Sequence, residues 1–131
     1  MTKVRTGKVK GSAFEYSCQY SLRNYTAYPV IRTSERGFQM QYDLRIELES
    51  GKYIAFECKR LAGFSWNELI KYFKKLEKVT KDNCFNRFLL FKGNNQPCLV
   101  MWKQDESYNV CTFEDYFGVP FEKHKSTRVK K

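Results

Sequence analysis

The chain has 131 residues, 42% of them hydrophobic and 17% aromatic, and a formal net charge of +10. This length is typical of one domain, and the apolar content supports a packed core, which excludes a wholly disordered chain. Apolar runs fall short of the roughly 20 residues that cross a bilayer, and the segment MTKVRTGKVKG lacks the apolar stretch of a secretory signal. The positive charge favours a polyanionic partner, either nucleic acid or an anionic membrane face.

The cysteine pattern indicates an intracellular protein. The cysteines are odd in number and form no CxxC pair: Cys18, Cys58, Cys84, Cys98 and Cys111. This pattern is typical of reduced thiols that lie mostly in a core. A zinc site is not expected, because the single histidine, His124, lies in a basic tail.

Basic residues concentrate at both ends of the chain. We expect a basic arm at residues 1–10, a single domain at 11–120 and a basic tail at 121–131. The two ends contain these cations: Lys3, Arg5, Lys8, Lys10, Lys123, Lys125, Arg128, Lys130 and Lys131. Such ends either bind phosphates or only keep a chain soluble, and the sequence leaves both readings open.

Apolar spacing predicts a first helix from Ser12 to about Tyr25. Phe14, Cys18, Leu22 and Tyr25 fall at spacings of four, four and three and would form one apolar face.

Three strands are expected to follow this helix. Alternation and β-branched content place them at about Ala27–Arg32, Gln41–Glu49 and Tyr53–Lys59. The polar loop TSERGFQ separates the first two, and the turn signal Ser50-Gly51 joins the second to the third.

A second helix is predicted from Ser65 to about Lys81. Ser65 and Glu68 have the spacing of a capping box. The predicted buried stripe is Trp66, Leu69, Ile70, Phe73 and Leu76. A basic row follows one exposed face: Lys71, Lys74, Lys75 and Lys78. Such a row either tracks a phosphate backbone or is a solvated helix face.

The remaining elements complete an α/β fold. Strands are predicted at Arg87–Lys92 and Cys98–Lys103, and Val110–Phe117 is expected to be a short strand that runs into a helical turn. The order predicts a mixed α/β class, with a central mixed β-sheet flanked by helices.

Two of these strands carry the candidate chemistry. Asp43 lies at the start of one, and Glu57 and Lys59 lie near the end of the next, on one face. A tight hairpin would bring the start of the first strand to the end of the second, so Asp43 would approach Glu57. Two neighbouring carboxylates are costly unless a cation neutralises them, and Mg²⁺ prefers oxygen ligands. Lys59 could then orient or deprotonate a water molecule, or stabilise charge on a phosphate.

Asp43 followed by Glu57-Cys58-Lys59 resembles the core of the PD-(D/E)xK nucleases. The segment KGSAFEYS is similar to the opening of archaeal and archaeal-virus Holliday-junction resolvases, where a helix brings a further carboxylate, here Glu15. VIRTSERG, with Arg32 and Ser34, takes the place of that family's Arg- and Ser-bearing loop. Tyr42 stands where the family has proline, and this loop is charged rather than rich in Gly and Ser.

The resemblance implies a restriction-endonuclease-like core and a metal-dependent endonuclease. Glu15, Asp43, Glu57 and the backbone carbonyl of Cys58 would hold Mg²⁺, or Mn²⁺ as a substitute, and Lys59 would assist catalysis. The implied partner is branched DNA such as a four-way junction, with no membrane partner. The implied assembly is a homodimer with Phe85–Phe117 as a candidate interface, in a prokaryotic or virus-infected cell.

DNA contacts are expected from one set of residues: Lys8, Lys10, Arg32, Ser34, Arg36, Arg60, Lys71, Lys74, Lys75 and Lys78. The second helix of such nucleases often offers a polar residue to the site, and Asn67, Glu68 and Lys71 are the candidates here.

Plainer interpretations exist for the same residues. Ser12 and Glu15 also have capping-box spacing, so Glu15 would then only cap its helix. Glu57 and Lys59 would be a surface pair, although a charge between Phe56 and Cys58 is expensive. The aromatic residues Tyr20, Tyr25, Tyr28 and Phe38 are expected in the core or in a dimer interface.

Two other functions remain compatible with the sequence. The same nuclease core would serve enzymes that act on duplex ends, nicks or single strands in repair or virus replication. Alternatively, a non-catalytic DNA-binding protein would use the basic surface alone, but clustered carboxylates would then only repel phosphate.

Overall fold

The computed structural model describes the backbone of residues 7–36 and 40–124, and the side chains of residues 12–35 and 40–124. The elements are, in chain order: α1 (Gly7–Arg23), β1 (Val30–Arg32), η1 (Thr33–Arg36), β2 (Leu44–Glu47), η2 (Glu49–Gly51), β3 (Tyr53–Arg60), α2 (Trp66–Val79), β4 (Cys84–Lys92), β5 (Leu99–Gln104), β6 (Ser107–Thr112) and α3 (Phe113–Phe117).

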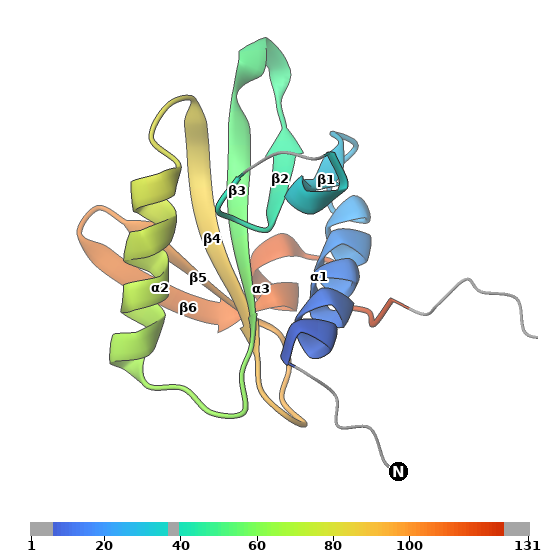
Figure 1. Ribbon diagram of the computed structural model, residues 1–131, viewed down its shortest axis with the longest axis vertical. Helices are drawn as coiled ribbons and strands as arrows, with labels where there is room; N and C mark the ends of the chain where they lie inside the picture. The colour runs from blue at the N-terminus through green and yellow to red at the C-terminus, as the bar shows by residue number, and fades with distance from the viewer. Residues whose placement is uncertain (1–6, 37–39, 125–131) are drawn as a thin grey trace, which may run out of the picture.

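The sheet is mixed, as the sequence predicts. Its six strands lie in the order β1-β2-β3-β4-β5-β6, and every neighbouring pair is antiparallel except β3 and β4. A parallel pair needs a long crossover, and α2 supplies it. Figure 1 shows the β2–β3 hairpin at one end of the sheet, and the loop before α2 at the other end, where β3 and β4 finish.

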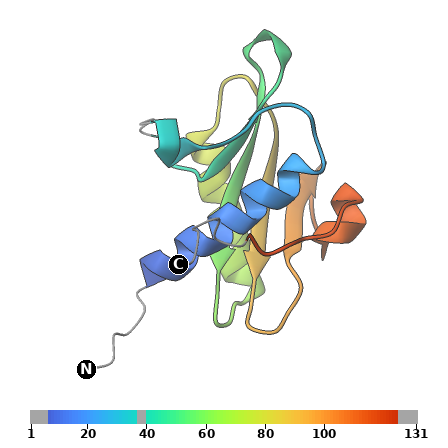
Figure 2. The ribbon, with the colours of Figure 1, turned by 90° about the vertical axis from the view of Figure 1, so that its right-hand side faces the viewer.

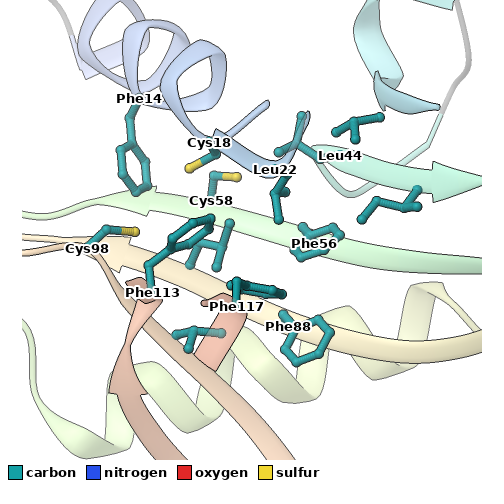
Figure 3. Close-up of a cluster of buried hydrophobic side chains, with 14 residues drawn as sticks. Phe14, Cys18, Leu22, Leu44, Phe56, Cys58, Phe88, Cys98, Phe113 and Phe117 are labelled. Atoms are coloured by element: carbon teal, nitrogen blue, oxygen red, sulfur yellow. The ribbon is translucent and has the colours of Figure 1, made fainter. Parts of the chain in front are cut away.

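Helices cover both faces of the sheet, with α1 on one side and α2 on the other (Figure 2). The α1 face holds the larger core, and α3 packs into it from the C-terminal side (Figure 3). The labelled side chains are Phe14, Cys18, Leu22, Leu44, Phe56, Cys58, Phe88, Cys98, Phe113 and Phe117. The predicted apolar face of the first helix is therefore confirmed for Phe14, Cys18 and Leu22. It is wrong for Tyr25, which lies beyond the last residue of α1, Arg23, and is exposed.

The α2 face has a smaller core. Leu69 and Phe73 pack against Leu89, Phe91 and Met101 of the sheet. Only part of the predicted stripe is buried, because Trp66, the first residue of the helix, is exposed.

Local chemistry fixes the start of α2. The Ser65 hydroxyl accepts a hydrogen bond from the Glu68 amide at 3.2 Å, and the Glu68 carboxylate accepts one from the Ser65 amide at 3.0 Å. This is the predicted capping box.

The first helix begins earlier than the sequence suggested. It starts at Gly7 and not at Ser12, so Ser12 lies inside the helix. Because a capping residue has to precede the first turn, Ser12 and Glu15 do not form a capping box.

The strand bounds also differ from expectation. β1 has only Val30–Arg32, since residues 24–29 turn and Pro29 cannot donate a ladder hydrogen bond. β2 is limited to Leu44–Glu47, so Asp43 lies directly before the strand.

The described cysteines are free, and Cys18, Cys58 and Cys98 are buried while Cys84 and Cys111 are partly exposed. Among residues 7–36 and 40–124, no helix is long and apolar enough to span a membrane.

The cap offers a test of this account of α2. Ser65→Ala removes the acceptor for the Glu68 amide, and we expect it to lower the free energy of unfolding by about 1 kcal/mol. Urea unfolding should show a lower midpoint with an unchanged slope. Ser65→Asp keeps an acceptor and is the matched control. Equal losses in both variants would contradict the capping role.

Candidate active site

A cleft of about 750 Å³ opens between α1, the segment before β2, the end of β3 and α2. It gathers residues that are far apart in the chain. The predicted site residues that line it are Glu15, Arg32, Ser34, Asp43, Glu57, Cys58, Lys59, Arg60 and Lys75.

The β2–β3 hairpin places Asp43. Leu44 pairs with Phe56, so Asp43 comes opposite Glu57, and the Asp43 amide donates to the Phe56 carbonyl at 3.1 Å. Asp43 Oδ2 accepts a hydrogen bond from the Cys58 amide at 2.8 Å. The predicted approach of Asp43 to Glu57 is thus present, and the aspartate is held by backbone.

Glu57 is a buried carboxylate on the α2 face of β3, with 9% of the residue exposed. Its Oε2 lies 3.4 Å from Lys59 Nζ. Burial first, and then the charge of Asp43, raise the pKa of Glu57 to about 7 against the opposing effects of Lys59 and Lys75. A plain surface pair does not describe this residue.

Glu15 reaches the same cleft from α1. Its Oε1 lies 3.2 Å from Arg32 Nη2. Burial first, and then Asp43, raise the pKa of Glu15 to about 7 against the opposing effect of Arg32. Since Glu15 lies well inside α1, its interpretation as a helix cap is wrong.

The charge of Asp43 raises the pKa of both Glu15 and Glu57, so the three carboxylates interact electrostatically within one cleft. Within residues 7–36 and 40–124, however, no group of three or more His, Cys, Asp or Glu side chains is placed so that it could hold a metal ion. The carboxylates contact Arg32, Lys59 and the Cys58 amide instead. The magnesium site therefore stays a prediction.

The donor chemistry nevertheless fits a hard divalent cation. The three side chains offer only carboxylate oxygens, the ligands that Mg²⁺ prefers. Two of them have raised pKa values, which a bound cation would lower because it favours the ionised form.

Arg32, a predicted DNA contact, is a buried residue at the end of β1. It is 8% exposed, its guanidinium lies 4.0 Å above the Tyr16 ring, and it holds Glu15. Its Nε is buried without a hydrogen-bond partner among the described residues. Ser34, by contrast, is exposed at the cleft.

The second helix contributes Tyr72, which sequence reasoning missed, beside Lys75, which was predicted only as a DNA contact. Tyr72 and Lys75 line the cleft, and Lys59 Nζ lies 4.7 Å from the centre of the Tyr72 ring. None of the three candidates Asn67, Glu68 and Lys71 lines it; they border a separate hollow on the outer side of α2. The signal in the sequence was their spacing, because residues three apart in a helix lie on one face.

The other predicted DNA contacts and aromatic residues do not line the cleft or lie outside the described residues. Lys71, Lys74 and Lys78 are exposed on α2, as expected of either a phosphate track or a solvated face. The side chains of Lys8, Lys10 and Arg36, and the whole of Phe38, lie outside the described residues. Tyr20, Tyr25 and Tyr28 are exposed, so they are not core residues.

Comparisons with known proteins give one fold likeness. No family model matches the chain, and no curated protein matches its sequence. Among solved structures, the chain is similar to Hjc, a Holliday junction resolvase from the hyperthermophilic archaeon Archaeoglobus fulgidus. The identity is 16%, the match covers 84% of this chain and 89% of that chain, and the TM-score is 0.45. A likeness of this degree carries no argument about activity, which has to come from the site.

The raised pKa values predict how stability depends on pH in EDTA. Between about 4.5 and 7, the folded protein binds more protons than the unfolded chain, so the free energy of unfolding falls as the pH rises. We expect Glu57 alone to contribute on the order of 2 kcal/mol to this fall, allowing for screening by water in the cleft.

Glu57→Gln isolates that contribution, because glutamine keeps the shape and cannot ionise. Urea unfolding should show the variant more stable than the wild type at about pH 8, with the difference shrinking at about pH 5. A difference of the same size at both pH values would contradict the electrostatic explanation.

Proposed function

We propose that this protein is a Mg²⁺-dependent endodeoxyribonuclease of the PD-(D/E)xK type that cuts branched DNA as a Holliday-junction resolvase. One observation carries the proposal. Glu15 comes from α1, Asp43 directly precedes β2, and Glu57 and Lys59 come from β3, and all four converge on one cleft. A purely DNA-binding surface gains nothing from three carboxylates that repel phosphate.

The residues divide the chemistry between them. Glu15, Asp43 and Glu57, with the Cys58 carbonyl, would hold the metal ion, as the motif resemblance implies. Mg²⁺, when bound, supplies positive charge for phosphate oxygens and makes water more acidic. Asp43 is already oriented by the Cys58 amide, so its carboxylate loses little freedom on binding a cation.

Lys59 would support the reaction from the same strand as Glu57. Its ammonium contacts Glu57 and the face of Tyr72, which hold the side chain in the cleft. There it can donate to a phosphate oxygen as negative charge develops, or orient the attacking water. Arg60 and Lys75 add cations at the rim, where neighbouring phosphates of the backbone would pass.

Branched DNA is the proposed substrate because of the order of the motifs. Helix Glu15, the Arg32 and Ser34 segment, Asp43 and then E-x-K together resemble the resolvases. The basic row Lys71, Lys74 and Lys78 lies along α2, on the same side of the sheet as Glu57 and Lys59, and suits a duplex arm.

Cleavage of labelled DNA tests the activity. The purified protein should place paired nicks in a four-way junction with Mg²⁺ and none in EDTA. Asp43→Asn keeps an acceptor for the Cys58 amide, and Lys59→Met keeps the length of the side chain. We expect each to slow cleavage by roughly 10²–10⁴-fold while DNA binding is retained.

The control is Lys52→Met, which removes one exposed cation from the hairpin end of the sheet. It should cut like the wild type. Mn²⁺ binding by calorimetry gives a readout besides activity, and it should weaken in Asp43→Asn. Faster cutting of duplex, nicked or single-stranded DNA would keep the site but change the substrate. Binding without cutting in any divalent metal would leave a DNA-binding protein.

A homodimer belongs to this proposal, since symmetric cutting of two strands requires two related sites. Phe85 and Val110 are exposed apolar side chains in the half of the chain expected to form the interface. Sedimentation should show a dimer at micromolar concentration, and Phe85→Glu should shift it toward monomer. A wild-type monomer would contradict the dimer.

A further inference from the structure

A second hollow, of about 270 Å³, lies beside the cleft, and Arg60 lines both. Its cations come from three separate places: Arg60 at the end of β3, Lys92 at the end of β4, and Lys123 after α3. Phe14 and Phe121 provide its apolar wall. Neither Lys92 nor Lys123 belongs to the catalytic machinery.

The Arg60 guanidinium is held in place without being neutralised. It donates to the Lys92 carbonyl at 3.2 Å and to Asn94 Oδ1 at 2.9 Å. Both partners are uncharged acceptors. Lys92 Nζ likewise donates to the Gly93 carbonyl at 3.3 Å.

Lys123 is brought to the hollow by a segment anchored on α1 (Figure 2). The amide of Glu122 donates to Ser21 Oγ at 2.9 Å, and the amide of His124 donates to Ser17 Oγ at 3.0 Å. Lys123 therefore lies between two anchored neighbours, although more than a hundred positions separate it from the start of α1.

The aromatic side chains of the same segment add to this anchoring. The Phe121 ring packs 5.9 Å from Phe14, and the His124 ring packs 5.8 Å from Tyr16 and 5.5 Å from Tyr20. Phe121 and Lys123 thus line the hollow from a segment that is anchored on α1.

The charge of this hollow is uncompensated within the described chain. None of Arg60, Lys92 and Lys123 has a carboxylate within 4.0 Å among the residues that the structure describes. The cations repel one another, so an anion placed between them would lower the electrostatic free energy.

We propose that this hollow is a second phosphate subsite, which binds a backbone phosphate of the same DNA whose scissile phosphate lies in the cleft. The inference rests on the proposed function. Lys75, Lys59, Arg60, Lys92 and Lys123 then form one basic band that crosses the end of the sheet from the α2 face to the α1 face. DNA held at both ends of this band has a fixed register over the catalytic carboxylates.

The salt dependence of DNA binding tests the subsite. The Lys92→Gln/Lys123→Gln double variant should bind a fluorescent four-way junction more weakly than the wild type in EDTA, by fluorescence anisotropy. Loss of one phosphate contact should reduce the slope of log K against log salt by about 0.9, which is about fivefold in affinity near 0.15 M salt. Cleavage at saturating DNA should remain.

The matched control is Lys52→Gln/Lys81→Gln, which removes the same net charge from exposed positions at the hairpin end of the sheet. It should keep the wild-type slope. Equal slopes in both double variants, with cutting intact, would overturn the subsite and leave the nuclease. A reduced slope in a protein that binds but never cuts would support the subsite and sink the nuclease. A wild type that does not bind DNA overturns both.

Discussion

The site depends first on the antiparallel pairing of β2 with β3. Leu44 opposite Phe56 sets Asp43 opposite Glu57, and the Cys58 amide then holds the Asp43 carboxylate at 2.8 Å. Side chains alternate along a strand, so a slip of one residue would take Leu44 out of the core and Asp43 out of the cleft together. The hydrophobic register that stabilises the sheet is therefore also what aligns the carboxylates.

Carboxylates and cations line the same cleft within a short distance of each other. The cleft concentrates carboxylates, two of them with pKa values raised to about 7 by burial and by Asp43, inside a chain of net charge +10. Arg32 and Lys59 offset part of that cost, while Arg60 and Lys75 lie at the rim. The cations at the rim would attract a polyanion. A cation bound by the carboxylates would offset their repulsion of its phosphates.

The cleft also requires both layers of helices. Glu15 arrives from α1 on one face, and Tyr72 and Lys75 arrive from α2 on the other, because the cleft lies at the end of the sheet where the two faces meet. The segment after α3 returns to α1 through Ser17 and Ser21. A substitution that alters the packing of either helix on the sheet would therefore shift the side chains that line the cleft.

The sequence by itself determined the local elements and the carboxylate hairpin. Period-two alternation, apolar spacing and the Ser65 capping box depend on residues that are close in the chain. The approach of Asp43 to Glu57 also depends on such residues, because one tight turn joins their strands. Only the tertiary structure decided the rest. The entry of Tyr72 and Lys75 into the cleft and the anchoring of residues 121–124 depend on contacts between distant segments. Local spacing cannot fix such contacts, because they arise only when the helices pack on the sheet.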